Sequence, residues 1–180
     1  MIEIIPNLHP LFVHFPIALL TVSAFFHVAA KAMRGKRRFA SPCAVLAHTT
    51  LWLGALFALP TVILGWQAFN SVKHDEAGHI AMSAHLAWAM PTFLLLALIA
   101  GWDAWRNKVD APPSGMFIAA VLVAWIMVAI TAWHGGELVY RHGLGVMSLP
   151  AAEDAEEHEH DHDHGAGHEH AHSGQVTGQP

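Results

Sequence analysis

The sequence predicts an all-α integral membrane protein: a four-helix bundle followed by a disordered tail rich in histidine, aspartate and glutamate. Of its 180 residues, 54% are hydrophobic and 13% are charged, and the mean hydropathy is +0.38. Soluble domains carry roughly a quarter charged residues. The chain also contains four long stretches without Asp, Glu, Lys or Arg. Each exceeds the ~20 residues that cross the hydrocarbon core of a bilayer.

These charge-free stretches locate the helices. They lie between Glu3 and Lys31, between Arg38 and Lys73, between Glu76 and Asp103, and between Asp110 and Glu137. We therefore predict membrane helices over residues 10–31, 42–67, 79–104 and 115–140, in one domain of residues 1–147. The first helix is not expected to be a cleavable signal peptide, because MIEIIPN has no basic residue and no small-residue cleavage site follows the apolar stretch.

The distribution of Lys and Arg predicts the orientation. Seven of the nine lie in the first and third loops: Lys31, Arg34, Lys36, Arg37, Arg38, Arg106 and Lys108. Loops rich in Lys and Arg are usually cytoplasmic. We expect a multi-pass protein of a bacterial inner membrane, surrounded by lipid, with both termini outside in the periplasm.

Residues 148–180 form a different kind of chain. Acids alternate with histidines and large apolar side chains are almost absent, so this tail is expected to be disordered. It carries seven histidines: His158, His160, His162, His164, His168, His170 and His172. Imidazole and carboxylate groups bind borderline divalent metal ions. The tail is therefore either a metal-binding segment or a solubilising acidic extension.

Cysteine chemistry is restricted to Cys43, the single cysteine of the chain. The sequence therefore has no intramolecular disulfide, no cysteine-rich metal site and no C-x-x-C-H motif for covalent heme attachment. A heme would have to be held by non-covalent axial ligands.

Histidines inside the predicted helices are the most informative feature. His14, His85 and His134 are expected on three different helices, roughly 6–9 Å below the same membrane surface. Ionisable residues in a membrane indicate a functional site. We predict a heme b or metal site from these three, with His9 at its boundary as a supporting group. Pro16 is expected to interrupt the first helix and to aim His14 inward.

A second pair, His27 and His48, is predicted near the opposite surface. Two histidine layers in a four-helix bundle resemble the layout of diheme b-type cytochromes. The pair is thus either a second heme site or an ordinary hydrogen-bonded contact between helices.

The segment WHGGELVYRHG, residues 133–143, supplies the expected surroundings of the first site. Gly135 and Gly136 would allow a macrocycle or another helix to approach closely. Arg141 and His142 follow at the depth where heme propionates would emerge. The alternative is that the glycines serve helix packing and that Glu137 pairs with Arg141.

Two motifs, HPLFVHFPIALL near the start and GGELVYRHGLGV near the end, resemble a bacterial membrane family known as domain of unknown function 2231. The resemblance implies four membrane helices. Because related domains occur beside c-type cytochrome or Rieske modules, it also implies redox work with such a partner. The matching positions are His9, His14, Pro16, Gly135, Gly136, Tyr140, Arg141, His142 and Gly143.

Three functions remain open. The first is electron transfer by a membrane-embedded b-type heme protein without substrate turnover. The second is binding or accessory transport of Zn, Cu or Ni. The tail would then collect ions for potential ligands around the outer opening: His9, His74, Asp75, Glu76 and His79, the last four within KHDEAGH. The third is a structural subunit without a cofactor. Hydrolytic catalysis fits poorly, because we expect no G-x-S-x-G elbow, no H-E-x-x-H pair and no carboxylate within the hydrocarbon layer. We expect no nucleic-acid partner.

Overall fold

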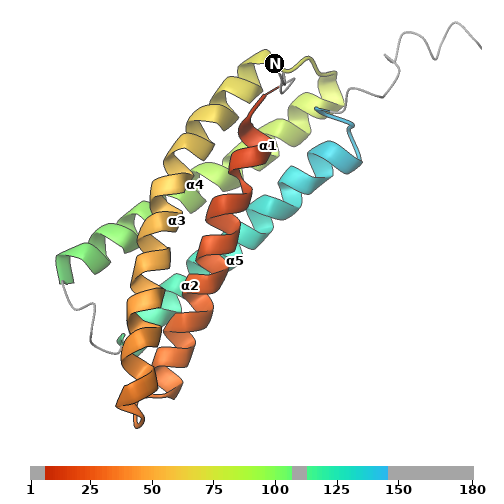
Figure 1. Cartoon of the computed structure of the whole chain (residues 1–180). Helices are drawn as coiled ribbons and strands as arrows, with labels where there is room; N and C mark the ends of the chain where they lie inside the picture. Colours follow the sequence, from red (N-terminus) through yellow and green to blue (C-terminus); the bar gives the residue numbers. More distant parts are fainter. Residues whose placement is uncertain (1–6, 107–112, 146–180) are drawn as a thin grey trace, which may run out of the picture. The chain divides into compact units, whose positions relative to one another are not determined.

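The computed structural model describes residues 7–106 and 113–145 and shows only helices there (Figure 1). They are α1 (His9–Phe12), α2 (His14–Ala32), α3 (Arg37–Ser71), α4 (Glu76–Arg106) and α5 (Gly115–Tyr140). The chain divides into two units, residues 1–147 and 148–180, and every described residue belongs to the first. The predicted all-α class is confirmed.

Four stretches are long and apolar enough to cross a membrane: His9–Ala32, Arg38–Ser71, Glu76–Arg106 and Gly115–Tyr140. This confirms the four membrane helices. The predicted limits were too short for α3 and α4, which begin at Arg37 and Glu76 rather than at residues 42 and 79. Charged residues do not end a helix, because helical hydrogen bonding continues beyond the apolar layer.

The first span is interrupted at Val13, between α1 and α2. Pro16 has no N–H, so it cannot donate to the carbonyl of Phe12 four residues earlier. Thr61 on α3 donates from Oγ1 to this carbonyl over 3.3 Å and to the Phe57 carbonyl over 2.8 Å. The expected interruption at Pro16 is therefore present, and α3 partly replaces the missing bond.

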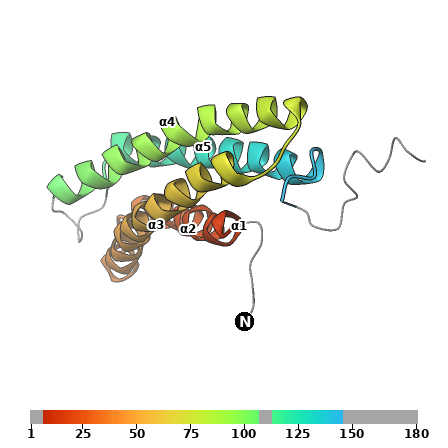
Figure 2. The ribbon, with the colours of Figure 1, turned by 90° about the horizontal axis from the view of Figure 1, so that it is seen from above.

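The helices form two layers, with α1, α2 and α3 in one and α4 and α5 in the other (Figure 2). The core between them contains large apolar side chains: Leu20, Leu51, Leu96, Phe117 and Val121. Many outward side chains are also apolar, among them Phe25, Leu94 and Leu98. Such an exterior is suited to contact with lipid tails rather than water.

The two ends of the bundle differ in composition. We call the end that carries Lys31, Arg38 and Arg106 the basic end. The opposite end, with Leu8 at the start and Arg141 after α5, is the terminal end. The histidines inside the spans, except the exposed His14, lie toward one end or the other.

Candidate functional site

The terminal-end group centres on His9 of α1 and His85 of α4. Their ring centres lie 6.4 Å apart, with the ring planes at 77°. Nδ1 of His9 donates to the backbone carbonyl of Thr61 over 2.9 Å. In the neutral ring, Nε2 therefore carries no hydrogen and has a free lone pair. Nδ1 of His85 is buried and has no hydrogen-bond partner in the described part of the chain.

Two glycines make room for these imidazole rings. A Cβ on Gly65 of α3 would lie 2.9 Å from Cε1 of His9, and one on Gly135 of α5 would lie 3.3 Å from Cε1 of His85. The space beside Gly135 is thus occupied by a histidine ring and is not open to a macrocycle, contrary to the expectation from the sequence. Gly136 differs, because a Cβ there would meet nothing within 4 Å.

His14 does not join this group. Its side chain is exposed, so the expectation that it faces inward is wrong. The cause is its position relative to Pro16, which is buried against the bundle. Two residues on a helix are separated by about 200° of rotation, so His14 faces the opposite way. His9 takes the inward position instead.

His134 lies beside the group but has other partners. Its ring stacks on Trp88 with ring centres 6.2 Å apart, and its Nδ1 lies 3.5 Å from Oε2 of Glu137. Glu137 also pairs with Arg141 over 3.3 Å, as the alternative interpretation of this segment predicted. Arg141 and His142 are both exposed.

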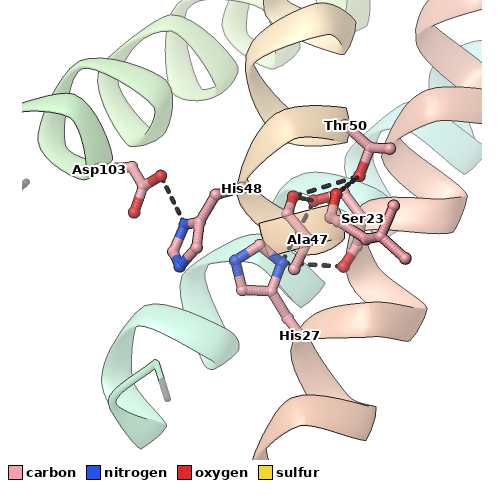
Figure 3. Close-up of polar contacts among 7 residues, drawn as sticks. Ser23, His27, Ala47, His48, Thr50 and Asp103 are labelled. Atoms are coloured by element: carbon pink, nitrogen blue, oxygen red, sulfur yellow. Dashed lines mark hydrogen bonds and ion pairs between the residues drawn. The ribbon is translucent and has the colours of Figure 1, made fainter. Parts of the chain in front are cut away.

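The basic-end group is the more deeply buried one (Figure 3). His27 of α2, His48 of α3 and Asp103 of α4 are 0%, 1% and 3% exposed. Nδ1 of His48 lies 2.6 Å from Oδ2 of Asp103, and Nδ1 of His27 donates to the Ser23 carbonyl over 2.8 Å. The two histidine rings lie 5.1 Å apart at 81°. The sequence thus correctly placed His27 and His48 side by side.

Both Nε2 atoms of this pair are buried and unpartnered among the residues described. The ring of Phe117 on α5 closes the group, with its centre 5.4 Å from that of His27 and 6.2 Å from that of His48. The guanidinium of Arg106 lies over the outer side of this environment, 4.4 Å from the Phe117 ring centre. The two Nε2 atoms are therefore shielded from solvent beside an aromatic ring.

Asp103 and Thr61 were missed from the sequence. The expectation that no carboxylate lies inside the spans is wrong, because Asp103 is within the Glu76–Arg106 span and buried. Its position at the end of a charge-free stretch made it look like a boundary residue. The sequence did contain a signal for the contact between Asp103 and His48. Because α3 and α4 run in opposite directions, residues 48 and 103 lie at similar depths near the same end of the bundle.

A third histidine pair, called the loop pair below, consists of His74 in the loop before α4 and His79 in the first turn of α4. Nε2 of His74 and Nδ1 of His79 are 3.1 Å apart, and the two exposed rings are stacked. Nδ1 of His74 donates to the Val72 carbonyl over 2.7 Å. Asp75 is not a third partner, because its Oδ1 accepts from the backbone N–H of Gly78.

Preformed metal cages and large hollows are not found at these positions. Residues 7–106 and 113–145 contain no group of three or more His, Cys, Asp or Glu side chains arranged to hold a metal ion. Two surface hollows, of about 310 and 450 Å³, are lined by residues around Gly35 and by residues around Ile130, and neither is lined by a histidine.

The seven tail histidines, His158 to His172, lie outside the described residues.

Comparison with known proteins agrees with this architecture. Residues 5–148 match a family described as predicted membrane proteins, DUF2231. The chain belongs to the DUF2231 family. The match includes both motifs that carried the resemblance. No curated protein and no solved structure matches the chain. Function in this DUF2231 protein therefore has to be argued from its own residues.

Proposed function

We propose that this DUF2231 protein is a b-type heme protein that carries electrons near the terminal end of its bundle, and that His9 and His85 would hold the heme iron. The observation that carries the proposal is the separation of the two rings. Metal–imidazole bonds are about 2 Å long, so two imidazoles on opposite sides of one iron have ring centres roughly 6 Å apart. The His9 and His85 ring centres are 6.4 Å apart.

The hydrogen bonds of these residues support ligation. Histidines that bind a metal usually donate the other ring N–H to a carbonyl or carboxylate, which fixes the ring. His9 does this with Thr61 and so presents Nε2. The buried, unpartnered Nδ1 of His85 is the kind of atom that a ligand would satisfy. A bound heme would supply one-electron chemistry between ferric and ferrous iron.

The neighbouring polar residues have supporting roles in this proposal. His134 and Glu137 lie next to the group, and Arg141 is held near it by Glu137. These side chains would tune the charge around the iron and orient heme propionates. A c-type cytochrome or Rieske-type protein is the proposed partner. It would dock at the terminal end, which we propose to face the periplasm because Lys and Arg are concentrated at the other end.

Absorbance spectra of the protein purified in detergent test the proposal. We expect heme bands that change on reduction with dithionite, and their loss in His9→Ala and His85→Ala. His14→Ala is the matched control, since His14 comes from the same motif but is exposed. A colourless protein from heme-replete cells would overturn the proposal. Bands that survive in His9→Ala but vanish in His14→Ala would overturn the ligand assignment.

A second candidate function, binding of divalent metal ions, is favoured by the loop pair. Nε2 of His74 and Nδ1 of His79 lie 3.1 Å apart on exposed side chains, and imidazole nitrogen is a ligand that zinc prefers. His74 and His79 could therefore share one ion whose other positions stay open. The tail histidines would raise the local concentration of such ions.

Equilibrium dialysis against zinc distinguishes the loop from the tail. We expect His74→Ala/His79→Ala to lose one class of bound zinc and deletion of residues 151–180 to lose another. His142→Ala, an exposed histidine outside the pair, is the control for the loop. Zinc binding that is unchanged in the double variant would contradict the loop site, and binding unchanged by the deletion would contradict the tail site.

A further inference from the structure

We propose that His27, His48 and Asp103 form a buried proton-binding site at the basic end, in which one proton is shared between the Nε2 atoms of the two histidines. This site lies in the other histidine group and does not depend on the heme proposal. No covalent chemistry is involved: a proton from water is bound by a nitrogen lone pair and is later released.

The hydrogen bonds determine which nitrogens are open. A backbone carbonyl only accepts, so Nδ1 of His27 carries the hydrogen that it donates to Ser23. The Asp103 carboxylate likewise accepts from Nδ1 of His48. Both neutral rings therefore present Nε2 as a lone pair. Two acceptors with no donor between them are unfavourable in a buried position.

One added proton would supply the hydrogen-bond donor that both Nε2 atoms lack. A proton on either Nε2 makes it a donor, and the other Nε2 becomes its acceptor. A hydrogen bond of about 3 Å, together with the distances from nitrogen to ring centre, corresponds to ring centres roughly 5 Å apart. The observed separation is 5.1 Å. Figure 3 shows the His27 and His48 rings facing one another from α2 and α3.

Charge balance favours a single positive charge. Asp103 contributes one negative charge from α4, so one added proton leaves the buried group neutral. Arg106, also on α4, contributes a positive charge next to the group, with its guanidinium 4.4 Å from the centre of the Phe117 ring that His27 also contacts. Lys31 on α2 is exposed, with its Nζ 3.2 Å from the Cβ position of Gly115. A divalent ion would leave excess positive charge beside these two cations.

The same geometry disfavours a second heme. The His27 and His48 rings are roughly 1 Å closer than two imidazoles on opposite sides of one iron. Proton sharing needs no additional space. Buried Asp and His side chains in membrane proteins often mark places where protons are bound and passed on.

The apolar core limits what the site can do. Leu20, Leu96 and Val121 lie on α2, α4 and α5 between the two histidine groups and are buried. Thr92 and Thr131 form a hydrogen-bonded pair between the two groups, but among the described residues no run of side-chain hydrogen bonds joins this pair to both histidine groups. The site would therefore exchange protons with the surface at the basic end rather than conduct them across the bilayer.

Nitrogen-15 NMR of the full-length protein in detergent, with ¹⁵N-labelled histidine, tests the proposal. Ring nitrogens with a bound proton, with a lone pair and with a shared proton have distinct chemical shifts. We expect one pair of Nε2 signals in the shared class, protected from exchange with water. It should vanish in His27→Gln and in Asp103→Asn, and it should persist in the control His14→Gln.

The possible outcomes are separable. Nε2 signals of pure lone-pair character across the pH range of stable folding would overturn the proposal, as would a shared signal that survives in Asp103→Asn. If Asp103→Asn does not fold, His27→Gln assigns the signal, because Gln cannot share an imidazole proton. One equivalent of metal in the purified protein that is lost in His27→Gln would also overturn it, since a metal would then occupy the space.

Discussion

His48 and Asp103 join α3 to α4 through a hydrogen bond of 2.6 Å between Nδ1 and Oδ2, with both side chains almost fully buried. Neither residue has water available to replace the other. The two partners are not equivalent, however. Loss of Asp103 leaves an unpaired N–H, whereas loss of His48 leaves an uncompensated carboxylate.

The first prediction concerns this asymmetry. Asp103→Leu should lower the free energy of unfolding by about 1–3 kcal/mol, the cost of a buried unpaired donor. His48→Leu should lower it by about 3–5 kcal/mol, because a buried charge loses its partner. The double variant should be more stable than His48→Leu alone. Unfolding titrations in mixed detergent measure all three, and equal costs for the two single variants would contradict the assignment.

The second prediction concerns the glycines beside the imidazole rings. Gly65→Ala should destabilise the protein, because its Cβ would lie 2.9 Å from Cε1 of His9, and on the heme proposal it should also lower heme content. Gly136→Ala is the matched control, since a Cβ there meets nothing within 4 Å. It should stabilise α5 by up to about 1 kcal/mol through the higher helix propensity of Ala.

Thermal denaturation and heme occupancy report on both glycine variants. The stability of Gly135→Ala should lie between those of Gly65→Ala and Gly136→Ala. Its Cβ would be 3.3 Å from Cε1 of His85, and a small movement of the ring relieves the contact. A Gly65→Ala protein as stable as the wild type would show that His9 is free to move away from α3.

The third prediction concerns the interruption between α1 and α2. Thr61→Val removes the Oγ1 donor to the Phe12 carbonyl, which Pro16 leaves without its helical partner. We expect the free energy of unfolding to fall by about 1–3 kcal/mol. In a Pro16→Ala background the helical N–H returns, so the same substitution should cost less. A double-mutant cycle measured by unfolding checks this coupling, and additive effects would contradict it.

The four membrane helices were predictable because the length of a charge-free stretch can be counted directly along the sequence. The same holds for depth, which placed His27 beside His48 without knowledge of the packing. The ends of α3 and α4 were not predictable in this way. Their terminal turns contain Arg37 and Glu76, which support a helix as well as they interrupt an apolar stretch.

The direction of each side chain was the unpredictable part of the candidate sites. One residue along a helix changes the facing direction by 100°, so the buried Pro16 turns His14 outward, and His9 on α1 takes the inward position. Asp103 shows the same limitation. Beside Trp102 and Arg106 it has the sequence context of a membrane boundary, and only its contact with His48 makes it a buried partner.

The last prediction concerns orientation, which the lysine and arginine distribution assigns and which single cysteines can report. In a Cys43→Ser background, Ser71→Cys lies at the terminal end of α3 and Gly35→Cys lies in the loop at the basic end. Ser71 is exposed, and a Cβ on Gly35 would meet nothing within 4 Å, so both sites accept the substitution. A maleimide that cannot cross the inner membrane should label Ser71→Cys in intact cells and Gly35→Cys only after lysis. The reverse pattern would place the basic end outside, and with it the His27–His48 group, leaving His9 and His85 on the cytoplasmic side.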